Sequence, residues 1–69
     1  MDNNELKTAL LRKSAVIYKN SMGQESEYKC VSGIIYRERN GHIDVYAEIT
    51  DLGGHSVTIC DPESLKFKE

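Results

Sequence analysis

Apolar residues near the start of the chain recur with the spacing of a helix. Leu6, Ala9 and Leu10 fall at positions i, i+3 and i+4, so their side chains share one helical face. An Asp or Asn at each of positions 2–4 can cap the N-terminus, and the helix is predicted over residues 3–12. A free helix of about ten residues is not stable in water. We therefore expect either that its apolar face docks on the rest of the chain, or that the segment is mobile and folds only on a partner.

The rest of the chain is rich in β-branched and aromatic residues, which favour strands, and turn residues divide it. Strands are predicted over residues 15–19, 28–39, 42–51, 56–60 and 65–67. The polar residues 20–26 predict a mobile loop. Before the last strand, Asp61 followed by Pro62 predicts a single helical or 3₁₀ turn with Asp61 as its cap.

Asn40 and Gly41 determine how the second and third predicted strands pair. Both residues tolerate the positive φ of a two-residue type I′ turn, which places Arg39 opposite His42. Residues opposite each other project from the same face of a sheet. One face of this hairpin is the predicted core face, and it carries Ile34, Tyr36, Ile43, Val45, Ala47 and Ile49.

The other face of the same hairpin combines charged and apolar residues. The register sets Arg37 against Asp44 as an ion pair. The apolar group on this face consists of Val31, Ile35 and Tyr46. An exposed apolar group of this kind requires a cover or a partner, and the N-terminal helix is the nearest cover. The alternative is that the second strand kinks at Gly33 and contributes to both sheets of a barrel.

The third and fourth predicted strands are joined at a pair of glycines. We predict a three-residue loop, residues 52–54, because this register sets Ile49 against the apolar Val57. A two-residue turn would set Ile49 against the polar Thr58 on the core face. Gly54 supplies the left-handed residue that a three-residue hairpin loop needs.

This order of elements resembles the SH3-like small barrel. The resemblance covers about residues 15–67, with a strand, a polar loop, a long hairpin on Asn40-Gly41, a second hairpin, a turn at Pro62 and a short last strand. In that fold the turn before the last strand is commonly 3₁₀. The resemblance does not extend to the binding of proline-rich peptides, because the loop over residues 20–26 is short and has no aromatic residue.

The predicted fold class is mainly β. We expect a five-stranded antiparallel SH3-like barrel, or a strongly bent sheet, preceded by one short N-terminal α-helix. Residues 1–69 are expected to form a single domain, with the helix in residues 1–13 and the small β-barrel in residues 14–69.

Length and charge narrow the possible functions. The 69 residues carry a net charge of −2, which disfavours general binding to nucleic-acid phosphates. The sequence has no run of about 18 apolar residues and its acidic start is unlike a secretory signal, so we expect a cytoplasmic protein with no membrane contact. Cys30 and Cys60 would then be reduced thiols. A chain this short buries only about 60% of its unfolded surface, so self-association or a partner is expected.

The sequence contains no pattern typical of a cofactor site, a metal site or a catalytic site. Structural zinc usually binds close pairs such as C-x₂-C, whereas the cysteines and histidines of this chain stand singly. His55 and Asp51 resemble a His–carboxylate dyad at a hairpin tip, but no nucleophile accompanies them. The acidic residues are too dispersed for a calcium loop. We therefore expect a non-enzymatic protein that has no cofactor.

Two functions are weighed for such a domain. The first is recognition of a protein partner, or of a second copy, through a sheet face or a strand edge. The residues predicted to serve it are Val31, Ile35, Tyr46, Arg37 and Arg39. The alternative is a nucleic-acid-associated barrel. The residues predicted for that alternative are Arg37, Arg39, Lys29, Tyr18 and Tyr28. Acidic residues interleave with this basic set, which favours the first function.

Overall fold

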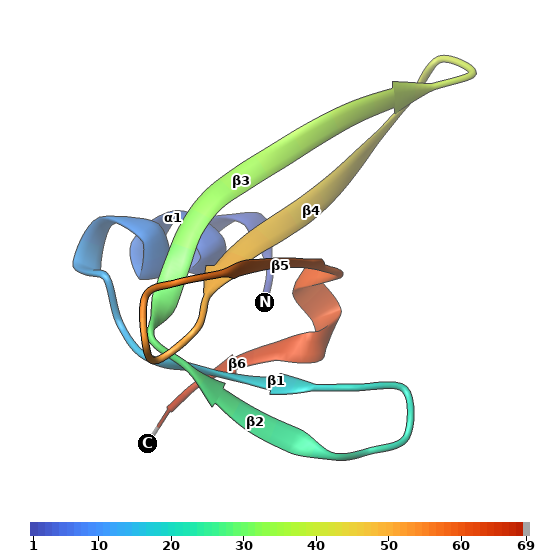
Figure 1. Cartoon of the computed structure of the whole chain (residues 1–69). Coiled ribbons are helices and arrows are strands. Elements are labelled where there is room, and N and C mark those ends of the chain that lie inside the picture. Colours follow the sequence, from blue (N-terminus) through green and yellow to red (C-terminus); the bar gives the residue numbers. More distant parts are fainter. Residues whose placement is uncertain (69) are drawn as a thin grey trace.

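The structure is a computed structural model that describes residues 1–68, and it is mainly β with one N-terminal α-helix, as predicted. The elements run in the order α1 (Asn3–Arg12), β1 (Val16–Lys19), β2 (Glu25–Tyr28), β3 (Cys30–Arg39), β4 (His42–Thr50), β5 (Val57–Cys60), the 3₁₀ helix η1 (Pro62–Ser64) and β6 (Leu65–Phe67). Their arrangement is shown in Figure 1. No helix within residues 1–68 is long and apolar enough to cross a membrane.

The described strands form two antiparallel sheets, with the strand orders β2-β1-β6 and β3-β4-β5. These sheets are not closed into a barrel in residues 1–68, so the expected closed barrel is not formed. The strand count also differs from the expected five, because residues 25–28, of which only Tyr28 belonged to the predicted second strand, form the separate strand β2 before β3. The Lys29 N–H donates to the carbonyl of Thr50 at 2.8 Å, at the point where the chain passes from one sheet to the other. Because β2 starts at Glu25, it also takes in the end of the predicted loop.

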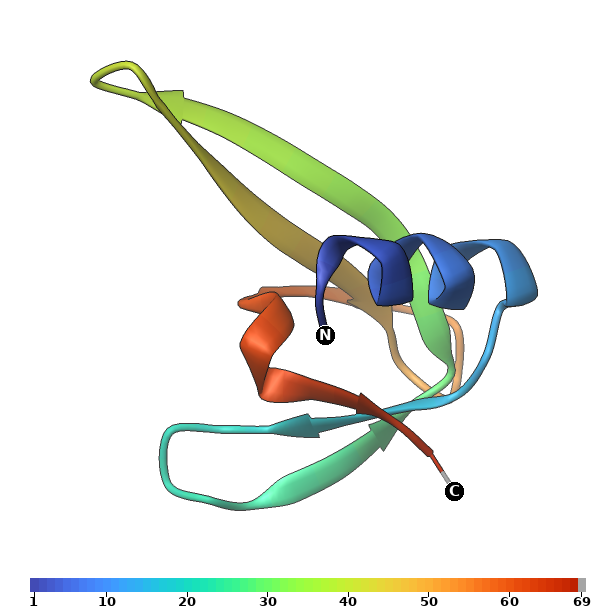
Figure 2. The ribbon, with the colours of Figure 1, turned by 180° about the vertical axis from the view of Figure 1, so that it is seen from behind.

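Helix α1 has the predicted bounds and is docked rather than free. Its N-terminus is closed by a capping box, in which the Asp2 carboxylate accepts from the Glu5 N–H at 2.8 Å and the Glu5 carboxylate accepts from the Asp2 N–H at 3.0 Å. Leu6 and Ala9 are buried against the core. Figure 2 shows α1 lying across the base of the β3–β4 hairpin. The helix therefore covers the core face of that hairpin, and not the outer apolar group that was expected beneath it.

The β3–β4 hairpin has the predicted turn and, over most of its length, the predicted register. Asn40 and Gly41 have φ angles of 52° and 81°, and Arg39 pairs with His42. The register shifts between Val31 and Gly33, as expected from the alternative of a kink at Gly33. One extra residue in β3 reverses the face of every residue before it. Val31 is therefore 1% exposed in the core, which corrects its placement in the outer group.

Part of the predicted core face extends beyond the core. Ala47 and Ile49 are buried, and Ile34 and Val45 pack against the core from its margin. The remaining two residues of that face are exposed: Tyr36 at 54% and Ile43 at 69%. Figure 1 shows the reason, since the β3–β4 hairpin projects as an arm past the helix and the rest of the sheet.

The predicted β4–β5 register is wrong by one residue. Ile49 pairs with Thr58 and Ala47 pairs with Cys60, so Cys60 is buried in the core while Val57 and Ile59 face outward. The register follows from a longer loop than expected. Its ends are held by the Asp51 N–H, which donates to the Ser56 carbonyl at 3.0 Å. Gly54, with φ of 73°, has the left-handed conformation that was predicted.

Candidate functional site

Three of the four sheet edges in the described residues are modified by charges or covered. At the β2 edge, Glu25 and Glu27 form ion pairs with lysines at positions 66 and 68, over distances of 3.0 and 2.8 Å. At the β6 edge, the Leu65 carbonyl accepts from the N-terminal ammonium group at 3.3 Å. On β3, helix α1 packs against the inner part of the strand, and the outer part carries the exposed charged residues Arg37, Glu38 and Arg39. Charged side chains and covering segments are the devices by which proteins prevent unwanted strand pairing.

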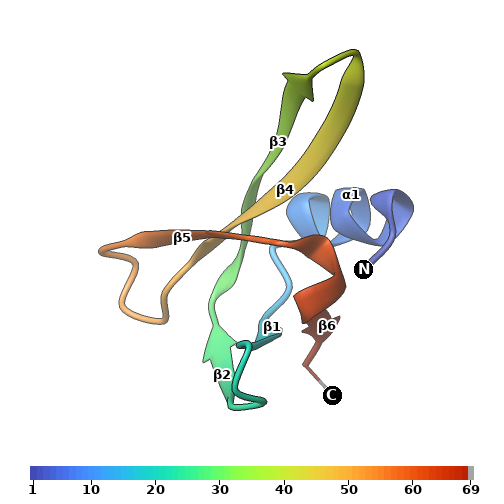
Figure 3. The ribbon, with the colours of Figure 1, turned by 90° about the vertical axis from the view of Figure 1, so that its right-hand side faces the viewer.

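The edge formed by β5 has none of these protections. Residues 57–60 include no charged residue and no proline, and within the described residues no strand pairs with the side of β5 turned away from β4. Figure 3 shows the course of β5 from the β4–β5 loop to η1. Two apolar side chains are exposed on this strand: Val57 at 54% and Ile59 at 41%. An apolar, uncharged edge of this kind is a template for another strand.

The backbone of β5 points hydrogen-bonding groups away from the sheet at these same two residues. The Asp51 N–H donates to the Ser56 carbonyl, so the backbones of these two residues turn toward each other across the hairpin, and such positions alternate along an antiparallel ladder. Thr58 and Cys60 therefore exchange their backbone bonds with β4. The N–H and C=O groups of Val57 and Ile59 point to the open side.

The loop before β5 is fixed by Asp51. Its carboxylate accepts from the His55 N–H at 2.8 Å, from the Ser56 N–H at 3.3 Å and from the Ser56 hydroxyl at 3.1 Å. The backbone N–H of His55, followed by that of Ser56, lowers the pKa of Asp51 below its ordinary value of 3.8. The expected Asp51–His55 pair is thus a backbone contact that positions β5, and it is not a side-chain dyad.

The outer face beside this edge holds part of the predicted partner-binding set. Ile35 pairs with Tyr46, and both are half-buried. The guanidinium of Arg37 lies 5.2 Å from the centroid of the Tyr46 ring, and the expected ion pair with Asp44 is made by Arg39 instead, at 3.6 Å. Val31 is absent from this face, for the reason given above.

Sequence reasoning missed Val57 and Ile59, which the structure adds to this face. The predicted register turned both into the core, because an apolar residue opposite Ile49 was preferred there over Thr58. The signal that could have identified them is Asp51, since an Asp at the start of a loop accepts bonds from backbone N–H groups a few residues later.

The basic and aromatic residues predicted for nucleic acid are not brought together. Arg37 and Arg39 lie on the projecting arm, whereas Lys29 lies between the two sheets. Tyr18 and Tyr28 belong to the other sheet, where their rings meet edge to face with centroids 6.0 Å apart and pack against the core.

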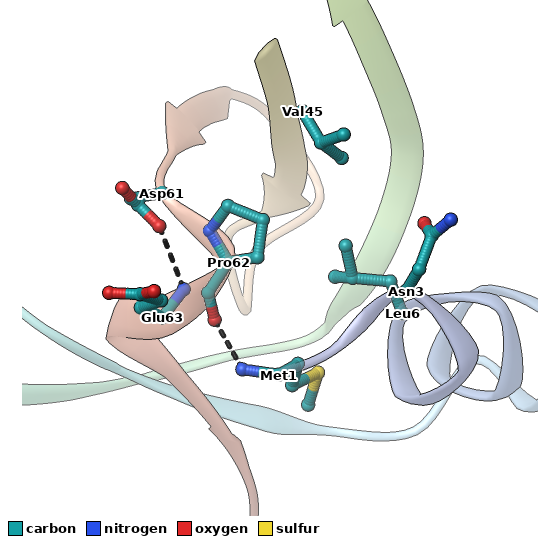
Figure 4. Close-up of a pocket in the computed structure, with 7 residues that line it drawn as sticks. All are labelled: Met1, Asn3, Leu6, Val45, Asp61, Pro62 and Glu63. Carbon is teal, nitrogen blue, oxygen red and sulfur yellow. Dashed lines mark hydrogen bonds between the residues drawn. The ribbon is translucent and has the colours of Figure 1, made fainter. Parts of the chain in front are cut away.

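A cavity of about 320 Å³ opens between the start of α1 and η1. Its apolar lining is contributed mainly by Leu6, Val45 and Pro62. In Figure 4 the carboxylates of Asp61 and Glu63 lie on the side of η1 that is turned away from Leu6 and Val45. Met1 also lines the cavity, and its N-terminal ammonium group donates to the Pro62 carbonyl there.

The thiols and histidines form no reactive cluster in the described residues. No group of three or more His, Cys, Asp or Glu side chains in residues 1–68 could hold a metal ion. Burial raises the pKa of the Cys60 thiol, which favours the unreactive protonated form.

Comparison of the chain with protein-family models, with curated proteins and with solved structures finds no match in any of the three.

Proposed function

We propose that this protein is a small non-enzymatic binding module that accepts a strand from a protein partner along β5. The observation that carries the proposal is the contrast between the edges. β5 combines two exposed apolar side chains with outward backbone groups, whereas charges or covering segments protect the others. The bound strand would gain backbone hydrogen bonds along the edge, the contacts that supply affinity in strand addition.

Apolar side chains on the outer face would also favour binding of the added strand at this edge. Every second side chain of the added strand would lie beside Val57 and Ile59, on the face that also carries Tyr46. Burying these exposed apolar groups contributes roughly 25 cal/mol per Å². We therefore propose that the partner segment alternates apolar and polar residues.

We also propose that the fold is an SH3-like barrel and that the protein is cytoplasmic. The strand orders β6-β1-β2 and β3-β4-β5, with η1 before the last strand, support an SH3-like barrel left open between β5 and β6. The unclosed gap leaves β5 available for a partner.

Nucleic-acid association is the second candidate. One observation favours it: Arg37 and Arg39 both lie on the exposed arm, and the guanidinium of Arg37 lies over the Tyr46 ring. If this candidate holds, retention on heparin and on a mixed DNA/RNA probe will fall steeply as salt is added. If strand addition alone holds, no salt-sensitive retention will be seen.

Site-specific photo-crosslinking in cells that express the protein tests whether a partner strand binds along β5. A photo-reactive amino acid replaces Val57 in one variant and Met22 in the matched control, since both side chains are exposed and Met22 lies in a distant loop. We expect discrete protein adducts from position 57 and none from position 22. Absence of adducts at position 57, or equal labelling at both positions, would contradict the proposal.

A further inference from the structure

We infer that the strand that β5 accepts belongs to a second copy of this chain, which makes a two-fold symmetric dimer with a continuous sheet across the interface. This inference rests on the proposed function, because it names the partner of the same edge. It follows from which residues lie opposite each other when two copies of β5 pair antiparallel through the backbone groups that point away from β4.

A symmetric antiparallel pairing must bring outward-facing residues opposite each other, because only these have free backbone groups. On β5 they are Val57 and Ile59. A two-fold axis beside Thr58 sets Val57 of one copy against Ile59 of the other, and the symmetry repeats the pair. Each pair can then exchange both backbone hydrogen bonds, and the apolar side chains of the two pairs gather on one face.

A hydrogen-bonding match continues this register beyond the strand. The same axis places His55 of one copy opposite Asp61 of the other, and the symmetry again repeats the contact. Both side chains are exposed, and Asp61 has the extended backbone conformation that prolongs the strand. An imidazole N–H can donate a hydrogen bond to a carboxylate that lies opposite it across the strands.

The neighbouring symmetric registers are worse matched. An axis beside Val57 would set His55 against Ile59, and an axis beside Ile59 would set Asp61 against Val57. Each places a polar or charged side chain beside an apolar one, with no partner for its hydrogen bonds. The edge is therefore self-complementary in one register.

The size of the edge predicts a weak dimer. Stable interfaces bury about 1,200–2,000 Å² in total, and pairing along a strand of this length buries less. The small core of a chain of 69 residues adds a reason to bury apolar surface by association. We expect a dissociation constant of about 10 μM to 1 mM, in the range of transient contacts.

Sedimentation equilibrium of the full chain, from about 1 μM to about 1 mM, measures this association directly. We expect a reversible monomer–dimer equilibrium that Ile59→Lys weakens by at least about tenfold, because the ammonium group enters the apolar contact. Ile43→Lys is the matched control, since Ile43 is more exposed than Ile59 and lies on the distant arm; its dimerisation should equal that of the wild type.

A charge variant tests the register itself. His55→Glu sets a carboxylate against Asp61 and should weaken the dimer by about two- to fivefold, whereas His55→Arg should keep or strengthen it. Circular dichroism of each variant checks that the fold is retained. A chain that stays monomeric up to about 1 mM, or a dimer that Ile59→Lys leaves unchanged, would overturn the inference.

The crosslinking experiment separates failure of this inference from failure of the proposed function. An adduct of twice the 7.8 kDa chain from position 57 supports the second copy. Adducts only with other proteins from position 57, and none from position 22, support strand addition but overturn the dimer. Absence of any adduct at position 57 contradicts both.

Discussion

Ile43 and Ile49 lie on the same face of β4, yet one is 69% exposed and the other is fully buried. The difference is their distance from the turn at Asn40-Gly41, because the first part of β4 belongs to the arm and the last part to the core. Residue identity and strand periodicity are the same in both cases. The contribution of each isoleucine to stability is therefore set by what lies over it.

This difference gives a matched pair of substitutions. Ile49→Ala should lower the free energy of unfolding by about 2–5 kcal/mol, because it leaves a cavity in a closed core. Ile43→Ala should change it by no more than about 0.5 kcal/mol. Urea denaturation followed by circular dichroism measures both values, and equal effects of the two substitutions would show that the core is misplaced.

Asp51 links the β4–β5 loop to pH. Its pKa is lowered in the folded state by the N–H groups of His55 and Ser56, so its ionised form stabilises the fold. That stabilisation is complete above the ordinary pKa of 3.8 and is lost as pH falls through the lower folded pKa. Wild type should therefore be more stable than Asp51→Asn at about pH 6, and the difference should shrink at about pH 3. A difference that is constant or grows on acidification would argue against the Asp51 contacts.

At the scale of elements, local signals predicted what local physics determines. The helix, the turn at Asn40-Gly41 and η1 with its Asp61 cap each depend on a few neighbouring residues, and their predicted positions are confirmed. The apolar face of α1 also follows from spacing alone. What the helix covers does not, because that depends on the face that β3 presents.

Strand pairing depends on contacts that are distant in sequence, and there the predictions were wrong in two places. The bulge before Gly33 leaves one residue of β3 unpaired and turns the Val31 side chain into the core. In the second hairpin, the bonds of Asp51 outweigh the apolar match of Ile49 with Val57. Because a shift of one residue exchanges the two faces of a strand, these two differences also changed the candidate site. Ile35, Tyr46, Arg37 and Arg39 kept their predicted face, Val31 left it, and Val57 and Ile59 joined it.

The docking of α1 is tested by two leucines of the same helix. Leu6 is buried and Leu11 is exposed. Leu6→Ala should lower the free energy of unfolding by about 2–5 kcal/mol, whereas Leu11→Ala should change it by no more than about 0.5 kcal/mol. Amide exchange over residues 6–11 at random-coil rates in the wild type would contradict a docked helix.

At the scale of the whole molecule, the two sheets of residues 1–68 leave the β5 edge without charged residues or a covering segment. Sheet A, formed by β2, β1 and β6, ends in ion pairs and in the contact of the N-terminal ammonium with Leu65. Sheet B is formed by β3, β4 and β5, and its β5 edge carries the exposed side chains of Val57 and Ile59. The proposed function and the proposed dimer both require that the backbone N–H and C=O groups of Val57 and Ile59 point away from β4.

Amide hydrogen exchange along β5 tests this claim most directly. In dilute solution the N–H groups of Thr58 and Cys60 bond to β4 and should exchange slowly, whereas those of Val57 and Ile59 should exchange at rates close to those of an open strand. At a chain concentration that populates the dimer, Val57 and Ile59 should become protected as well. Slow exchange at Val57 and Ile59 in dilute solution, with fast exchange at Thr58 and Cys60, would show that the free edge presents the opposite residues and would contradict the account.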